Sequence, residues 1–347
     1  MTAQGTYLIT GGSGFLGSFL VKHLLSIGCK VRSFSRNEHS VEALCKSVGN
    51  HPSFSPLLGS VEDRHRLSKA MRGVDFVIHA AAQKIVPLAE YDPATCIQTN
   101  VQGTRNVADA CLEVGVKRAV FISTDKASAP ATLYGASKLC AERLWLGSNR
   151  YSAGHGTAYM AVRYGNCWGS TGSVLHAWSA SLAKQAPPQA VEPQRAASHA
   201  SAASGGLGGH SQAKLVLTDP RCTRFHITRP EAAQLAFACL ESALPGELWI
   251  PKLPTYRIGD LCHAFRLAYG IEAAPDVVGL RLAEKLHEDL ISPHESIACR
   301  EQGEGKYVLV PGAIHDRGGW GYSSGTPGHQ LGVEELVGMV KAWRDGV

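Results

Sequence analysis

A glycine-rich turn near the N-terminus lies between a short apolar run and an amphipathic segment. The apolar run spans residues 6–10, the turn is Gly11-Gly12-Ser13-Gly14, and residues 15–27 carry apolar side chains at helical spacing. This order predicts a β-strand, a tight turn and an α-helix. Glycines let the backbone approach a pyrophosphate, whose charge is met by free N–H groups at the helix N-terminus. We therefore predict a dinucleotide-binding turn; the alternative is a plain tight turn.

The alternation of apolar runs and helical patterns continues to about residue 163. Strands are predicted at residues 30–34, 54–57, 75–79, 118–123 and 158–163, with helices at 41–48, 63–71, 93–114 and 134–146 between them. Such alternation predicts βαβ units and a parallel sheet with helices on both faces. The predicted fold class is α/β, a Rossmann-type doubly wound parallel sheet with a smaller, interleaved C-terminal domain.

The second half of the chain has a looser pattern, richer in Gly, Pro and Trp. We assign residues 1–165 to the dinucleotide-binding domain, with returning segments at about 222–252, and residues 166–347 mainly to a substrate-binding domain. Residues 187–213 consist mostly of Ala, Ser, Gly, Pro, Gln and His and lack apolar periodicity. That composition predicts a flexible surface insertion rather than a functional lid.

Composition argues against several classes of function. The 347 residues carry a net charge of +5 without a dense Lys/Arg block, so we expect a small anionic ligand and no nucleic acid. Ten scattered cysteines without C-x-x-C pairs predict reduced thiols and a cytoplasmic protein. We expect neither a secretion signal nor a membrane span. The fifteen histidines form no H-x-x-x-H pattern, so no metal site is predicted.

The end of the second predicted strand bears on the choice of dinucleotide. NAD-selective folds usually place a carboxylate there, which bonds the ribose hydroxyls. This chain has Ser35 and Arg36 instead, and a hydroxyl followed by a guanidinium suits the 2′-phosphate of NADP. We predict NADP, with NAD open as the alternative because Glu38 is close by. The predicted cofactor contacts are Gly11, Gly14, Phe15, Gly17, Ser35, Arg36, Asp63, Ala80, Ala81 and Lys138.

Tyr134 and Lys138 are one helical turn apart, so both side chains reach the same face of the predicted helix. A nearby ammonium stabilises phenolate and should lower the pKa of the tyrosine toward neutrality, which would make it a usable base. Ser123 or Thr124, at the C-terminal end of the preceding strand, can bond the same substrate hydroxyl. This set suffices to move a hydride.

An acid and a base, Asp125 and Lys126, precede this helix, and hydride transfer alone does not require them. With their surroundings they resemble the extended short-chain dehydrogenase/reductase family, and more closely the inverting UDP-N-acetylglucosamine 4,6-dehydratases of nonulosonic acid and capsule biosynthesis. The most specific motifs are Ser123-Thr124-Asp125-Lys126-Ala127, Tyr134-Gly135-Ala136-Ser137-Lys138 and R-x-x-E-K-L-H-E at residues 281–288. The resemblance extends over nearly the whole chain except residues 187–213 and those after about 310.

The resemblance implies an NADP-dependent hydro-lyase acting on a UDP-N-acetylhexosamine. Tyr134 and Lys138 would support oxidation at sugar carbon 4, and the new ketone acidifies the proton on carbon 5. Lys126 would be the base for that proton and Asp125 the acid for the departing hydroxide, after which the hydride returns to carbon 6. Asp125 must then be protonated, through burial or a neighbouring anion. Lys126 must be partly neutral, which desolvation and nearby Lys138 would favour.

Two rival functions stay open at this point. A nucleotide-sugar 4-epimerase or simple oxidoreductase would use Tyr134 and Lys138 but not the acid–base pair, which could be a surface ion pair. A catalytically degenerate dinucleotide-binding sensor or scaffold would use neither. Inversion at carbon 5 is expected for the dehydratase, but the sequence does not determine the face of reprotonation.

The resemblance also implies substrate contacts and an assembly. Cationic groups and amides should meet the two phosphates and the uridine. The predicted substrate-binding residues are Lys84, Asn166, Ser173, Arg224, Arg281 and Glu284. Glu288 could bond the nucleoside ribose, with surface pairing as an equal alternative, and a homo-oligomer is expected. The chain departs from the family at Leu282-Ala283, where Pro-Gly is usual.

Overall fold

A computed structural model of the chain describes residues 3–152, 156–185, 213–303, 305–315, 318–326 and 328–346. The predicted insertion at 187–213 therefore lies outside the described residues, except for Ala213. The chain forms two compact units. Unit 1 comprises Met1–Cys167, Ile227–Leu253 and Glu288–Ser323, and unit 2 comprises Trp168–His226, Pro254–His287 and Ser324–Val347. Residues 288–323, which the sequence assigns mainly to the substrate-binding domain, pack with unit 1.

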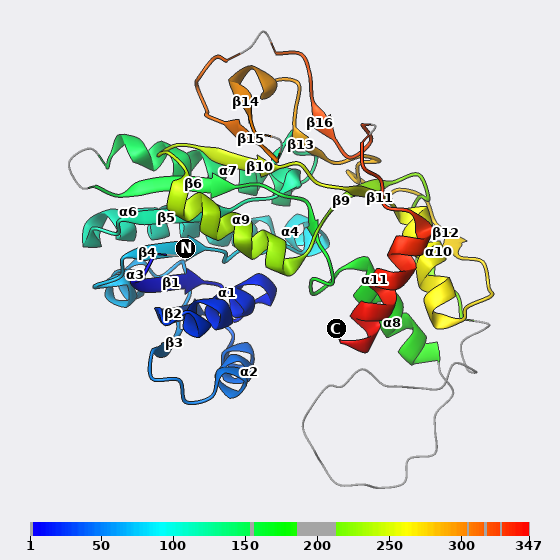
Figure 1. Ribbon diagram of the computed structural model, residues 1–347, viewed down its shortest axis with the longest axis horizontal. Coiled ribbons are helices and arrows are strands. Elements are labelled where there is room, and N and C mark those ends of the chain that lie inside the picture. Colours follow the sequence, from blue (N-terminus) through cyan, green and yellow to red (C-terminus); the bar gives the residue numbers. More distant parts are fainter. Residues whose placement is uncertain are drawn as a thin grey trace, which may run out of the picture. The chain divides into compact units, whose positions relative to one another are not determined.

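Unit 1 is built on a nine-stranded sheet in the order β14-β15-β10-β6-β5-β4-β1-β2-β3 (Figure 1). From β3 to β10 neighbouring strands are parallel, whereas β15 and β14 are antiparallel. The strands are β1 (Thr6–Thr10), β2 (Lys30–Ser35), β3 (Phe54–Leu58), β4 (Phe76–His79), β5 (Arg118–Ile122), β6 (Ala158–Val162), β10 (Leu248–Pro251), β14 (Cys299–Gln302) and β15 (Lys306–Leu309). The central strands are fully buried apolar runs, as parallel strands covered on both faces must be. The predicted α/β doubly wound fold is confirmed.

Helices cover both faces of this sheet. On one face α1 packs against α9, and on the other α6 packs between α3 and α7 (Figure 1). The helices of unit 1 are α1 (Phe15–Ser26), α2 (Glu38–Val48), α3 (Arg64–Met71), α4 (Val86–Tyr91), α5 (Pro93–Ile97), α6 (Gly103–Val114), α7 (Leu133–Gly147) and α9 (Arg229–Ser242), with 3₁₀ turns η2 (Asp125–Ala127), η3 (Ser148–Arg150) and η4 (Ser296–Ala298). The helix predicted at 93–114 contains a π-helical turn, η1 (Gln98–Gln102), between α5 and α6.

Unit 2 is smaller and has its own apolar core. Its helices are α8 (Val174–Gln185), α10 (Ile258–Tyr269) and α11 (Val333–Asp345), and its strands include β8 (Val216–Leu217), β9 (Thr223–Ile227, of which Ile227 belongs to unit 1), β11 (Thr255–Arg257) and β12 (Asp276–Val277). Trp178 and Phe265 lie in this core. The short strands β7 (Asn166–Cys167), β13 (Asp289–Ile291) and β16 (Tyr322–Ser323) belong to unit 1. None of the described helices has the length and apolarity needed to cross a membrane.

Candidate active site

The glycine turn lies where the strand order of the sheet reverses. Thr10, the last residue of β1, pairs with Phe34 of β2 on one side and His79 of β4 on the other. Gly11 has a φ of +67° and a Cβ there would lie 2.9 Å from the Ala81 nitrogen, while a Cβ on Gly17 would collide with the Gly11 carbonyl oxygen. Glycine is therefore required at both positions. Doubly wound sheets bind ligands at such a point.

The N-terminus of α1 fits a pyrophosphate. Gly14 offers no side-chain cap, whereas α2, α3, α7 and α9 are capped by the side chains of Asn37, Asp63, Thr132 and Thr228. The first N–H groups of α1 are thus left for an anion.

Of the remaining predicted cofactor contacts, some lie next to the glycine turn and one does not. Ser35 accepts a hydrogen bond from the Ser13 nitrogen at 3.0 Å, and Arg36 is exposed at the end of β2. The Ala81 nitrogen donates to the Thr10 hydroxyl at 3.3 Å. Asp63 caps α3 by accepting from the Arg66 nitrogen. Ser35 is thus engaged with the glycine turn and Arg36 is exposed at the end of β2, while Asp63 already has a structural partner.

Asn100, in the π-helical turn, holds the loop after β4. Its side chain exchanges two hydrogen bonds with the Gln83 backbone, at 2.8 and 2.9 Å, and donates a third to the Ser137 hydroxyl at 2.9 Å. Asn100 thus connects the loop after β4 to α7 through hydrogen bonds. The sequence analysis assigned no role to Asn100, because its contacts with Gln83 and Ser137 join residues far apart in the chain.

Lys138 and Tyr134 are both buried on α7. The Lys138 ammonium donates to the Ile122 carbonyl at 2.8 Å, and burial lowers the pKa of Lys138 to about 7, with Glu142 opposing. Burial raises the pKa of Tyr134 to about 12, although the Lys126 charge and a hydrogen bond with Thr124 act in the opposite direction. The expected fall of the tyrosine pKa toward neutrality is therefore not seen, because desolvation outweighs the nearby cation.

Asp125 lies in η2, directly before α7. A Cβ on Gly135 would collide with the Lys126 carbonyl, so this glycine lets η2 and α7 approach closely. Oδ1 of Asp125 accepts hydrogen bonds from the Thr124 hydroxyl at 3.0 Å and from Lys126 Nζ at 3.1 Å. Its Oδ2 is buried without a partner among the described residues. Burial raises the pKa of Asp125, the Lys126 charge lowers it, and the Glu288 charge raises it further.

Lys126 forms a second ion pair, which sequence reasoning did not foresee. Its Nζ lies 3.1 Å from Oε1 of Glu288, whose side chain is only 7% exposed, while that of Lys126 is 26% exposed. This contact adds a second carboxylate to the surroundings of Lys126, where the sequence analysis considered only desolvation and nearby Lys138. The sequence left a ribose contact and a surface pairing open for Glu288; the structure pairs it with Lys126, with its side chain shielded from solvent. The pairing spans 162 positions, which local patterns cannot reveal.

Ser123, which the sequence offered beside Thr124 as a hydrogen-bond partner of the substrate, is buried and bonded within the protein. Its hydroxyl donates to Glu142 Oε2 at 2.7 Å. Thr124 instead lies beside Asp125 and Tyr134. Of the two hydroxyl residues, Thr124 is therefore the one placed among the acid–base groups.

The predicted substrate residues fall into separate groups. In unit 2, Arg224 is buried and lies 3.3 Å from Glu284, which also accepts from the Arg281 nitrogen at 3.2 Å. Ser173 bonds His176 at the start of α8. Lys84 and Asn166 are exposed residues of unit 1. The structure thus brings Arg224, Glu284 and the Arg281 backbone together.

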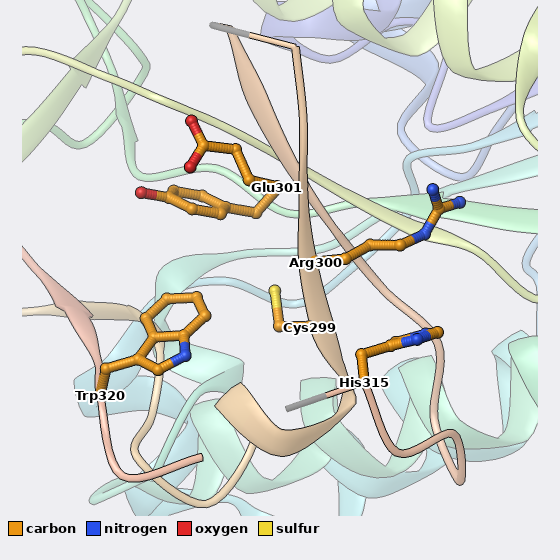
Figure 2. Close-up of a pocket in the computed structure, with 6 residues that line it drawn as sticks. Cys299, Arg300, Glu301, His315 and Trp320 are labelled. Atoms are coloured by element: carbon orange, nitrogen blue, oxygen red, sulfur yellow. The ribbon is translucent and has the colours of Figure 1, made fainter. Parts of the chain in front are cut away.

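A cavity of about 440 Å³ at the β14–β15 edge of unit 1 is a distinct feature (Figure 2). It is lined by Cys299, Arg300, Glu301, Tyr307, His315 and Trp320, none of which the sequence predicted as functional. Arg300 is paired with Glu247 at 2.9 Å, and Glu301 with Lys252. Because these charges are satisfied within the protein, we do not assign the cavity to the reaction.

The chain is similar to a known protein family, to characterised enzymes and to a solved structure. Residues 7–194 and 210–309 match the family model described as polysaccharide biosynthesis protein. A UDP-N-acetylglucosamine 4,6-dehydratase (inverting) from Campylobacter jejuni is 39% identical over 306 residues, covering 88% of this chain and 82% of that protein. A UDP-glucose 4-epimerase from Rickettsia canadensis is 29% identical, covering 90% and 84%. The X-ray structure of Pen from Bacillus thuringiensis is 28% identical and superimposes with a TM-score of 0.85, covering 99% of each chain.

Proposed function

Because the chain belongs to the family of polysaccharide biosynthesis proteins, we propose that it is a hydro-lyase that dehydrates UDP-N-acetylglucosamine to the UDP-4-keto-6-deoxy sugar. The observation that carries this proposal is the arrangement at Asp125. This carboxyl is buried and has a raised pKa; its Oδ1 pairs with the Lys126 ammonium, and its Oδ2 has no hydrogen-bond partner within the part of the chain that the structure describes. A redox enzyme without an elimination step has no use for a buried acid in this position.

The residues divide into two sets with separate tasks. A bound nicotinamide dinucleotide would supply the hydride acceptor for sugar carbon 4 and the hydride donor for carbon 6. Tyr134 takes the proton of the 4-hydroxyl, and Thr124 shares a hydrogen bond with it. Lys126 removes the carbon 5 proton, and Asp125 protonates the departing 6-hydroxide. Reprotonation of carbon 5 on the opposite face, with inversion, is part of the proposal.

We propose NADP as the dinucleotide. Support comes from the uncapped N-terminus of α1 and from the Ser35–Arg36 pair, which presents a hydroxyl and an exposed guanidinium in place of a carboxylate. Binding of the UDP moiety by unit 2 through Arg224 and Arg281, a cytoplasmic location and a homo-oligomeric state remain predictions.

A nucleotide-sugar 4-epimerase is the second candidate, favoured by the similarity to the Rickettsia enzyme. It would need Tyr134 and Lys138 but would leave Asp125 idle. The near-complete burial of Asp125, at 1% exposure, argues against a surface ion pair that merely happens to precede α7.

The deciding experiment incubates the purified protein with UDP-N-acetylglucosamine and NADP and follows the mass of the nucleotide sugar. We expect loss of one water, and no loss with Tyr134→Phe. A product of unchanged mass but altered configuration at carbon 4 would support the epimerase instead. Bound nucleotide without any product would indicate a sensor or scaffold.

A further inference from the structure

Glu288 approaches Lys126 from a part of the chain far from the catalytic motifs. It directly precedes β13, which packs against η2. Lys126 Nζ lies 3.1 Å from both Asp125 Oδ1 and Glu288 Oε1, so the ammonium bridges two carboxylates. Both carboxylate side chains are almost fully shielded from solvent, at 1% and 7% exposure. A buried carboxylate is costly unless it is paired, so this contact accounts for the placement of Glu288.

A rigid framework delivers Glu288 to this position. Arg163, fully buried at the end of β6, donates to the Leu290 carbonyl at 2.8 Å and thereby fixes β13. On the other side of β13, the Ser323 hydroxyl donates to the Glu288 carbonyl at 3.3 Å, and Asp289 pairs with Ser323 of β16. Glu288 is thus held by main-chain contacts rather than by a mobile surface loop.

Other titratable side chains surround Asp125, Lys126 and Glu288. From α7, Tyr134 interacts with Asp125 and Lys126, while Lys138 donates to the Ile122 carbonyl. The carbonyl of Tyr164, shortly after β6, accepts the Asp125 N–H. From the β13 side come Asp289 and Tyr322, whose hydroxyl bonds the Leu253 backbone. The negative charge of Glu295 is balanced by the Arg163 guanidinium at 2.8 Å, which lowers the pKa of Glu295 to about 2. Asp125, Lys126 and Glu288 therefore form one acid–base cluster.

A cluster with protonated Asp125, cationic Lys126 and anionic Glu288 has no net charge, which suits a buried site. The elimination, however, requires Lys126 as a neutral amine while Asp125 keeps its proton. Loss of the Lys126 proton to solvent would leave a net negative charge in the site. Its transfer to Glu288 keeps the cluster neutral and needs only the existing 3.1 Å contact.

We propose that Glu288 is a positioning residue of the elimination step, whose carboxylate accepts the proton of Lys126 so that the amine can remove the proton from carbon 5. This proposal rests on the proposed dehydratase function. In the step, one N–H bond of the Lys126 ammonium breaks and an O–H bond forms on Glu288. The freed lone pair of Lys126 then takes the carbon 5 proton, while the proton of Asp125 leaves with the 6-hydroxide as water. No external oxidant or reductant is required.

The kinetic test compares Glu288→Gln with wild type across pH. The Gln side chain keeps the shape but removes the charge that helps to raise the pKa of Asp125. Asp125 must be protonated to act, so the high-pH limb of the dehydration rate moves to lower pH in the variant. We also expect dehydration at neutral pH to slow by about tenfold or more, whereas reduction of the bound nicotinamide by substrate proceeds at the wild-type rate.

Two further variants separate this role from a structural one. Glu288→Asp keeps the charge and should restore part of the rate and the wild-type pH limb. Glu301→Gln removes a carboxylate from the same C-terminal segment of unit 1, where it pairs with Lys252, and should leave the profile unchanged. An unshifted pH limb in Glu288→Gln, or an equal loss of nicotinamide reduction, would overturn the proposal.

A pH titration of the Asp125 carboxyl without substrate tests its coupling to Glu288 independently of the proposed function. Infrared spectroscopy follows the C=O band of protonated buried carboxyls, and Asp125→Asn identifies the contribution of Asp125. We expect this band to disappear at lower pH in Glu288→Gln than in wild type. An unchanged titration contradicts the coupling between Glu288 and Asp125. A shifted titration together with a wild type that loses no water from UDP-N-acetylglucosamine would instead retain the coupling and reject the dehydratase.

Discussion

Arg163 and Glu142 form an ion pair in which neither side chain is exposed to solvent, with Nη2 and Oε1 2.6 Å apart. The same guanidinium lies 2.8 Å from Glu295 Oε1, and Glu142 also accepts the Ser123 hydroxyl. This network joins the end of β5, α7 and the segment after β13 beneath the acid–base cluster. Because Glu142 depends on Arg163 for its charge balance and Glu295 shares the same guanidinium, we treat the three residues as one unit.

Removal of Arg163 should therefore destabilise unit 1 strongly. For Arg163→Met we expect the free energy of unfolding to fall by about 3–5 kcal/mol, because the fully buried carboxylate of Glu142 loses its ion-pair partner and Glu295 keeps only Arg143 among the described residues. Chemical denaturation measures this loss. Arg143 is the matched control, since it contacts Glu295 at 3.2 Å but is 38% exposed. Arg143→Met should cost less than about 1 kcal/mol. Similar losses in both variants would contradict the importance of burial.

Arg36 should distinguish the two dinucleotides. Arg36→Ala removes the guanidinium proposed to bind the 2′-phosphate, so we expect the dissociation constant of NADP to rise by about tenfold to a hundredfold. The constant for NAD should change little. Calorimetric titration of each dinucleotide measures both values, and Lys46→Ala, an exposed cation of α2, controls for general charge loss. An equal weakening of both dinucleotides would reject the NADP assignment.

The sequence predicted the fold because its signals are local. The apolar run at residues 6–10, the glycine turn and the helical spacing after it each lie within one element, and Tyr134 and Lys138 share one helical turn. Asn100 and Glu288 could not be assigned in this way. Their roles depend on contacts with Gln83 and Lys126 that exist only after the chain has folded.

The expectation for the pKa of Tyr134 failed for a physical reason. A helical spacing places Lys138 near Tyr134, but it carries no information on how deeply both side chains are buried. Desolvation determines the pKa of each, and it raises that of Tyr134. For Lys126 the sequence could not show the second carboxylate, because that group comes from residue 288.

Ala283 adopts a conformation that L-residues disfavour, with a φ of +62°. The resemblance described above implies glycine at this position. Ala283→Gly should therefore raise the free energy of unfolding by about 1 kcal/mol, because glycine adopts a positive φ without a steric penalty. The opposite sign is expected for Ala342→Gly inside α11, where glycine costs about 1 kcal/mol. Thermal melts of the two variants test the pair, and destabilisation by Ala283→Gly would show that the strain is absent.

His79 should make stability fall in acid. Burial lowers the pKa of His79 from 6.5 to about 3, and the neutral ring bridges the hydroxyls of Thr10 and Thr104 at 2.6 and 2.9 Å. The unfolded chain therefore binds a proton that the folded protein excludes between these values. The contribution of His79 is complete above pH 6.5 and is lost at about 1.4 kcal/mol per pH unit as the pH falls toward 3.

Urea denaturation between pH 4 and 7 measures this slope on the intact protein. His79→Gln, which has no titratable ring, should show a shallower dependence on pH by roughly one proton. Equal slopes in the two proteins would show that His79 does not carry this effect.

The central claim is that Asp125 and Lys126 perform an elimination inside a redox cycle run by Tyr134 and Lys138. A single turnover of Lys126→Ala with UDP-N-acetylglucosamine tests it most directly, with nicotinamide absorbance and the mass of the sugar recorded together. We predict that the bound cofactor becomes reduced while the sugar loses no water. Full dehydration by this variant would contradict the account.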